Sequence, residues 1–129
     1  MTTSIRPMTM LLAVLCAYGV ATTSQAEPSN KWRIELDHTA DNDGAIVLRI
    51  APVGGMPIDV EAKIPAKTRE NHAARILRDA LKAALGKGYH VETDDGEDVL
   101  IGKRGDTPNF DLTLVSSSVT GLTIELERE

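Results

Sequence analysis

Apolar and polar residues alternate along most of the chain after residue 30. Alternation with a period of two is typical of a strand with one buried face and one wet face. In the first such stretch, Trp32, Ile34 and Leu36 share one side and charged residues fill the other. The pattern predicts strands over 31–37, 45–51, 58–64, 89–93, 98–104, 110–114 and 122–127.

The period changes in the middle of the chain, where the sequence predicts one amphipathic helix over about 68–86. Apolar residues recur there at helical spacing, at Ala73, Ile76, Leu77, Ala80, Leu81, Ala84 and Leu85. Thr68 is the expected N-cap residue. Gly86 or Gly88 is expected to supply the left-handed residue at the C-terminal end.

The predicted order of elements is β-β-β-α-β-β-β-β, which places the chain in the α+β class. Short turns favour antiparallel neighbours. We therefore expect a mostly antiparallel sheet, with the helix packed on it or wrapped by it. A short leader at 27–30 precedes residues 31–129, which are expected to form a single domain because about 100 residues suffice for one core.

The predicted helix is too narrow to cover the apolar face of all seven strands. Seven strands at ~4.8 Å spacing would form a flat sheet roughly 30 Å wide, whereas one helix is about 10 Å across. Soluble monomers rarely leave so large an apolar face open. Three arrangements resolve the mismatch. The sheet curls around the helix, the first three strands form a separate layer, or the uncovered face pairs with another copy or a partner.

Residues 1–26 have the pattern of a cleavable export signal. Arg6 supplies a positive charge, 8–20 is an apolar run, and small residues lead to Ala26. The run is shorter than the ~20 residues of a spanning helix, so no stable membrane span is expected after cleavage. Cleavage is expected after Ala26, with Ala21 as the alternative, and the protein is expected to be periplasmic or secreted.

Removal of the signal would change the composition of the working domain. Cys16 is the single cysteine and would leave with the signal, so no disulfide is expected. The chain has 14 Lys and Arg against 19 Asp and Glu, a net charge of −5, and the loss of Arg6 makes it more negative. An acidic domain with few aromatic side chains is not expected to bind nucleic acid.

Two acidic turns are candidates for a calcium site. One carries Asp41 and Asp43 before a glycine, and the other carries Asp94 and Asp95 before a glycine. The alternative interpretation is that both are hairpin turns rich in Asx residues. If the fold brings the turns together, the four carboxylates could share one weak Ca²⁺ ion.

Basic residues gather on one side of the predicted helix, at Arg75, Arg78 and Lys82. This face is a candidate for binding an anionic partner or surface. The alternative is an ordinary solvated helix face, balanced by acidic strands elsewhere.

No catalytic motif is evident, so no catalytic residue and no cofactor is predicted. The mature chain has no cysteine, no Gly-x-Ser-x-Gly nucleophile elbow and no HExxH motif. We expect an exported, non-enzymatic binding or envelope-assembly module, acting through a sheet face, an edge strand or the basic helix face on a protein partner or a second copy. The alternative is a curled sheet with a pocket for a small apolar ligand, or a cofactor-free hydrolase or isomerase.

Overall fold

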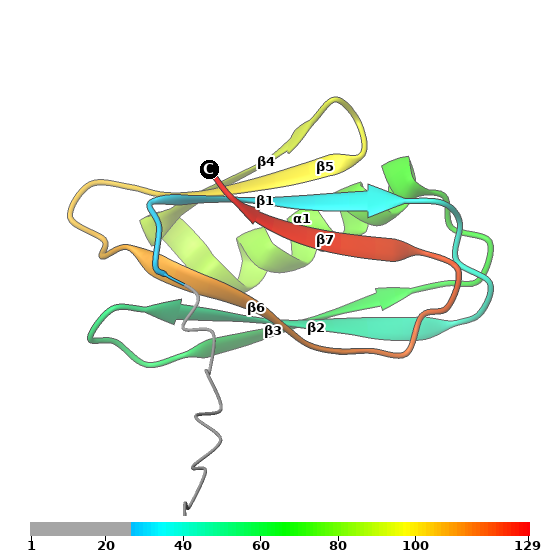
Figure 1. Cartoon of the computed structure of the whole chain (residues 1–129), viewed down its shortest axis with the longest axis horizontal. Helices are drawn as coiled ribbons and strands as arrows, with labels where there is room; N and C mark the ends of the chain where they lie inside the picture. The colour runs from blue at the N-terminus through cyan, green and yellow to red at the C-terminus, as the bar shows by residue number, and fades with distance from the viewer. Residues whose placement is uncertain (1–26) are drawn as a thin grey trace, which may run out of the picture.

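The computed structural model describes residues 27–129 (Figure 1). It confirms an α+β fold with seven strands and one α-helix in the predicted order. The predicted export signal at 1–26 lies outside the described residues. The elements are β1 (Lys31–Asp37), β2 (Gly44–Pro52), β3 (Ile58–Ile64), α1 (Glu70–Leu85), a 3₁₀ turn η1 (Gly86–Gly88), β4 (Tyr89–Asp94), β5 (Asp98–Lys103), β6 (Phe110–Ser117) and β7 (Thr123–Arg128).

The strands divide between two antiparallel sheets. The larger sheet has the order β4-β5-β1-β7, and the smaller sheet has the order β3-β2-β6. In Figure 1 the larger sheet lies above the smaller one. The first three strands do not form a separate layer. β1 pairs with β5 and β7, whereas β2 pairs with β3 and β6. Two sheets resolve the covering mismatch by burying their apolar faces against each other.

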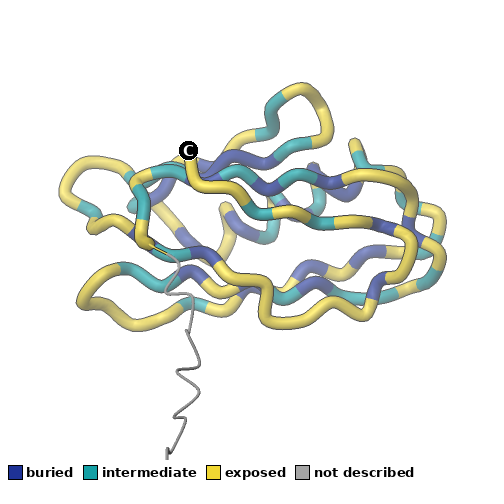
Figure 2. The backbone as a smooth tube through the Cα atoms, viewed as in Figure 1, coloured by how far each residue is buried: buried dark blue, intermediate teal, exposed yellow. Residues whose placement is uncertain are grey.

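The helix closes one side of this two-sheet arrangement. It packs against β3 and β4, which are edge strands of the two sheets. The side of α1 that faces the core is buried (Figure 2), through Ala73, Ala74, Leu77, Leu81 and Leu85. The alanines allow the helix backbone to lie close to the strands.

The ends of α1 differ in part from the sequence prediction. The N-cap residue is Arg69, which makes no side-chain capping bond. Thr68 does not cap, because its hydroxyl donates to the Pro65 carbonyl at 2.6 Å. At the other end Gly86 has a positive φ of 64°, but its ψ of −150° lies outside the left-handed helical region, and its N–H donates to the Lys82 carbonyl.

Phe110 joins the two sheets. It begins β6 and is fully buried. Its ring packs edge-to-face against Tyr89 of β4, with 5.2 Å between ring centroids and 89° between planes. Its carbonyl accepts hydrogen bonds from Trp32 Nε1 of β1 at 2.8 Å and from the Ser29 N–H at 2.9 Å. Among the described residues no polar or charged residue is buried, so apolar packing fills the interior.

Within 27–129 the structure has no helix that is both long and apolar enough to cross a membrane.

Gly121 lies where the loop between β6 and β7 passes the loop between β1 and β2. It has φ of 85°, in the region that glycine adopts most easily. A Cβ there would lie 2.5 Å from the Thr39 carbonyl oxygen and 2.6 Å from Asp41 Oδ2. The loops are joined by Asp41 N–H donating to the Thr120 carbonyl at 2.8 Å.

Leu77→Ala should lower the free energy of unfolding by about 2–5 kcal/mol, because it removes a fully buried side chain between helix and strands. Urea unfolding followed by circular dichroism measures the change. Leu114→Ala is the control, since Leu114 is 39% exposed. This variant should lose much less free energy of unfolding. Equal losses would contradict the closing role of α1.

Gly121→Ala should destabilise the protein more than Gly54→Ala. Both glycines have positive φ, but a Cβ at Gly54 meets no atom within 4 Å. The difference in thermal unfolding midpoint between the two variants therefore isolates the steric clash at Gly121 from backbone strain. Matching midpoints would show that the two loops separate without cost.

Candidate functional site

The two sheets together have four edge strands, β3, β4, β6 and β7. An edge strand presents unpaired N–H and C=O groups that can pair with another chain. The helix packs against β3 and β4, so it covers two of the edges. The edges of β6 and β7 remain, and Figure 1 shows these two strands on the near side of the domain with α1 behind them.

The edge of β7 is protected by charge. Glu125 and Glu127 are exposed on its outer face, while Ile124 and Leu126 point inward and are half-buried. Charged side chains along an edge oppose pairing with another strand. An acidic or neutral partner strand therefore gains little by adding to β7.

The edge of β6 lacks this protection. No charged residue lies between Leu112 and Ser117. Leu114 is 39% exposed and Val115 is 45% exposed. Leu114 lies opposite the buried Leu48 of β2, so it belongs to the inward-facing row and is left partly uncovered because nothing lies beyond the edge.

The pairing of β6 with the leader shows which of its backbone N–H and C=O groups point away from β2. Ser29 and Phe110 exchange two backbone hydrogen bonds of 2.9 Å each. Since the backbone groups of a strand point alternately to its two sides, those of Leu112 and Leu114 point the same way as those of Phe110. Val115 is the extra residue of a bulge, because Leu48 pairs with Leu114 and Val47 pairs with Ser116.

The leader bounds this free edge at one end. Ser29 Oγ donates to the Glu129 carbonyl at 3.2 Å, and Glu27 forms an ion pair with Arg128 of β7 at 2.7 Å. Together with the Phe110 pairing, these contacts tie the start of the domain to both sheets. Because Leu112 is only 2% exposed, the open stretch of β6 is short and lies at Leu114 and the bulge at Val115.

The outer face of the larger sheet is acidic. Arg33 of β1 is its central cation, and its guanidinium binds Asp94 at 3.0 Å, Asp98 at 2.8 Å and Glu129. These three carboxylates, Glu129 foremost, raise the pKa of Arg33. The guanidinium is thus held through Nε and Nη1.

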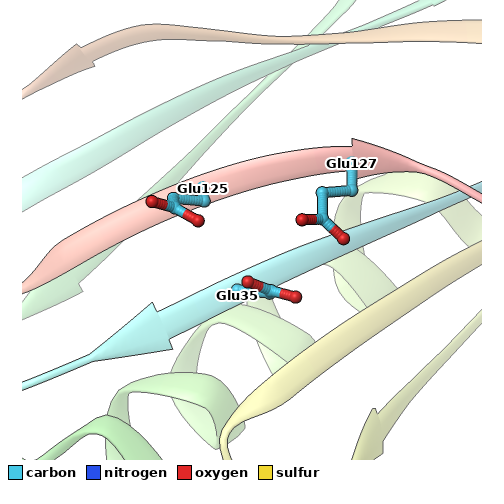
Figure 3. A group of neighbouring side chains, drawn as sticks. All are labelled: Glu35, Glu125 and Glu127. Carbon is cyan, nitrogen blue, oxygen red and sulfur yellow. The ribbon is translucent and has the colours of Figure 1, made fainter.

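Beside Arg33 lies a group of three glutamates that form no ion pair within residues 27–129. The carboxylate oxygens of Glu35, Glu125 and Glu127 lie within 4.8 Å of one another (Figure 3). Glu35 of β1 lies directly across from Glu125 of β7. Repulsion from Glu127 is the largest cause of a raised pKa at Glu35, followed by desolvation, Asp98 and Glu125. Like charges on neighbouring strands destabilise the sheet.

The four predicted calcium ligands have different surroundings in the structure. Asp43 Oδ1 accepts a hydrogen bond from the Ala66 N–H at 2.7 Å, and Asp41 lies against Gly121. Asp94 binds Arg33, and Asp95 occupies a turn position with φ of 50°. In the part of the chain that the structure describes, the one group of at least three closely spaced ligands is the glutamate group of β1 and β7.

The three predicted basic residues of α1 have different surroundings. Arg75 lines a surface hollow with Lys67, Arg69 and His72. Arg78 forms an ion pair with Asp79 at 3.0 Å. Lys82 lines a second hollow, which includes Lys87, His90 and Arg104. The basic character predicted for the helix therefore extends into the loops at both of its ends.

Comparison with known proteins gives no family for the chain. No family model matches it, and no curated protein matches it either.

The sequence prediction missed both the β6 edge and the glutamate group. The uncharged run 112–117 is visible in the sequence, but its place at a sheet edge depends on the pairing of distant strands. Glu35 and Glu127 are likewise brought together only by the pairing of β1 with β7.

Glu127→Gln should lower the pKa of Glu35 toward its ordinary value of 4.5, because it removes the largest repulsion on that carboxylate. An NMR titration of the Glu35 side chain measures the shift. Glu125→Gln is the control and should have the smaller effect. The raised pKa means that ionised Glu35 destabilises the fold at neutral pH. This penalty is lost as the pH falls through the raised pKa toward 4.5, and it is absent below 4.5. An unchanged Glu35 pKa in both variants would contradict the repulsion.

Proposed function

We propose that the protein is an exported, non-enzymatic binding or assembly module that takes an extended segment of a protein partner onto the edge of β6. Strand addition of this kind gains affinity from main-chain hydrogen bonds and specificity from alternate side chains. The chain itself then supplies recognition and carries out no reaction.

The observation that carries the proposal is the contrast among the four edges. The helix packs on β3 and β4, and β7 bears Glu125 and Glu127. β6 has neither a helix nor charges along Leu112–Ser117. Natural sheets guard exposed edges with charges, prolines, bulges or covering elements. β6 has a bulge at Val115 but neither a charge nor a covering helix along this stretch, so it is the least guarded of the four edges.

The side chains beside this edge support the same function. Leu114 and Val115 are two of the four large apolar residues that the described chain exposes, together with Val53 and Met56. Val53 and Met56 lie in the turn between β2 and β3. An added strand would cover Leu114 on the inward side and Val115 at the bulge, which would remove apolar surface from water.

Export is the second part of the proposal, and it is supported by the composition of residues 1–26. Cleavage after Ala26 would make Glu27 the first residue of the mature chain. Glu27 is bound to Arg128 of β7, and Ser29 is paired with Phe110 of β6. The mature N-terminus would therefore lie beside the start of the proposed binding edge, where Leu112 is buried, while Leu114 and Val115 stay exposed.

A photo-reactive phenylalanine analogue at Val115, in cells of the protein's own species, should form covalent adducts with the partner. The same residue at Met56 is the control, since Met56 is also apolar and is 84% exposed but lies away from the edge. Mass spectrometry of the exported fraction identifies the adducts. Adding Leu114→Lys to the Val115 probe should remove them, because an inward-pointing charge guards an edge.

Equal adducts at Val115 and Met56, or none at Val115, would count against the proposed edge. Retention of the adducts in the Leu114→Lys variant would do the same, provided that its thermal melt shows a folded protein.

A further inference from the structure

We infer that one end of the domain is a docking surface for the anionic lipid headgroups of a membrane. Two exposed apolar side chains at the tip of a hairpin would enter the membrane interface, and a cluster of cations beside them would bind the headgroups. Peripheral membrane binding combines these two features, insertion of apolar side chains and attraction to anionic lipid. The inference concerns a different surface from the β6 edge and does not depend on it.

The turn between β2 and β3 forms an apolar tip, which we define as residues 52–57, with the sequence Pro-Val-Gly-Gly-Met-Pro. Val53 is 55% exposed and Met56 is 84% exposed. The nearest charged residues are Arg49 and Asp59, which form an ion pair with each other, with 2.7 Å from Nε to Oδ1. The apolar tip is therefore an exposed projection without a charge of its own.

The backbone of the apolar tip has few unpaired donors. Pro52 and Pro57 carry no N–H. The Val53 N–H donates to the Asn109 carbonyl at 2.9 Å, and the Gly55 N–H donates to the Pro52 carbonyl at 3.1 Å. Two N–H groups of the tip are left. Burial of an unpaired backbone group away from water costs free energy, so this turn can enter the headgroup region at a smaller cost than an ordinary polar turn.

Cations lie at the same end of the domain as the apolar tip. Figure 1 shows the β2–β3 turn, the loop between β5 and β6 and the C-terminal end of α1 together at this end. The three segments are 52–57, 103–109 and 82–88, and the Arg104 N–H links two of them by donating to the Gly88 carbonyl at 2.9 Å. Asp106 is their one carboxylate. Their four cations, which we call the end cations, are Lys82, Lys87, Lys103 and Arg104.

The charge of the end cations is available to a ligand. None of them forms an ion pair within residues 27–129. Lys82, Lys87 and Arg104 are exposed and line one surface hollow. Arg104 Nη2 donates to His90 Nδ1 at 2.8 Å, and because a guanidinium only donates, this ring nitrogen is an unprotonated acceptor. The carboxylate of Glu92 contacts the other ring nitrogen at 3.1 Å, so it reaches Arg104 only through the ring.

The combination of an apolar tip and cations selects a bilayer over other partners. Two apolar side chains on one turn are a small patch beside a stable protein interface, which buries about 800 Å² on each partner. A soluble anion would bind the cations and leave Met56 in water. A bilayer accommodates both features, since apolar side chains enter roughly 5–10 Å into the boundary between headgroups and acyl chains while cations bind the headgroups.

The distribution of charge would orient the domain on a membrane. The chain has a net charge of −5, so an anionic surface repels most of its faces and attracts the end that carries the end cations. The strands run along the longest axis of the domain (Figure 1), and docking by this end would stand the domain upright. Leu114 and Val115 lie further along β6, so the β6 edge would remain open to a partner.

Vesicle flotation measures the docking. The chain, in the form that accumulates in its own cells, should float with vesicles of equal parts phosphatidylglycerol and phosphatidylcholine, and not with pure phosphatidylcholine. Lys87→Gln with Arg104→Gln should weaken binding roughly 25-fold, because each cation near the surface contributes about fivefold. Lys67→Gln with Arg69→Gln is the matched control, since it removes the same charge before the opposite end of α1 and should change binding much less.

A tryptophan at the apolar tip reports insertion directly. The fluorescence of Met56→Trp should be quenched by anionic vesicles with brominated acyl chains. Val115→Trp is the control, because Val115 is 45% exposed on β6 and should stay in water. Trp32 is 5% exposed and gives both variants the same background. Met56→Ser should weaken vesicle binding about tenfold through the loss of buried apolar area, whereas Val115→Ser should not.

The outcomes decide between a membrane and other ligands. No flotation with anionic vesicles, or equal quenching in Met56→Trp and Val115→Trp, overturns the inference. Weaker binding in Lys87→Gln with Arg104→Gln but full binding in Met56→Ser also overturns it, because the surface then binds anions without inserting. Thermal melts confirm that each variant is folded. None of these outcomes bears on the β6 edge, which the adducts at Val115 test separately.

Discussion

The contacts of Phe110 hold the two sheets in one domain, and the rest of the architecture depends on them. Its ring meets Tyr89 of the larger sheet, while its backbone belongs to the smaller sheet. Its carbonyl accepts from Trp32 and from Ser29, so the indole N–H has a partner inside an otherwise apolar interior. Truncation of its side chain would remove the ring contact with Tyr89, whereas the hydrogen bonds to its carbonyl belong to the backbone.

The two sides of the domain are closed in different ways. On one side α1 fills the space between β3 and β4 with Leu77, Leu81 and small alanines. On the other side, the leader and the loop around Gly121 join the sheets only at the ends of β6 and β7. The interior row therefore reaches the surface at Leu114. One helix is enough to close one side, and the opposite side carries the proposed binding edge.

Local patterns in the sequence predicted the elements well, and their assembly much less. Alternation located all seven strands and the apolar stripe located α1, because burial of one face produces a regular spacing of apolar residues over a short stretch of sequence. The capping role of Thr68 was wrong, because its hydroxyl bonds to Pro65 instead. The split between sheets and the meeting of Glu35 with Glu127 arise from pairings far apart in sequence, which alternation does not encode. The run 112–117 became informative only once β6 was known to be an edge.

The position of the two chain ends has a mechanical consequence. The start of β1 lies beside the end of β7, where the Glu129 N–H donates to the Lys31 carbonyl at 3.0 Å and Trp32 pairs with Arg128. A force that pulls residues 27 and 129 apart would act along the hydrogen bonds between β1 and β7, because these bonds run perpendicular to the strands. The bonds would therefore break one pair after another. Such a domain yields at low force when it is held by its ends.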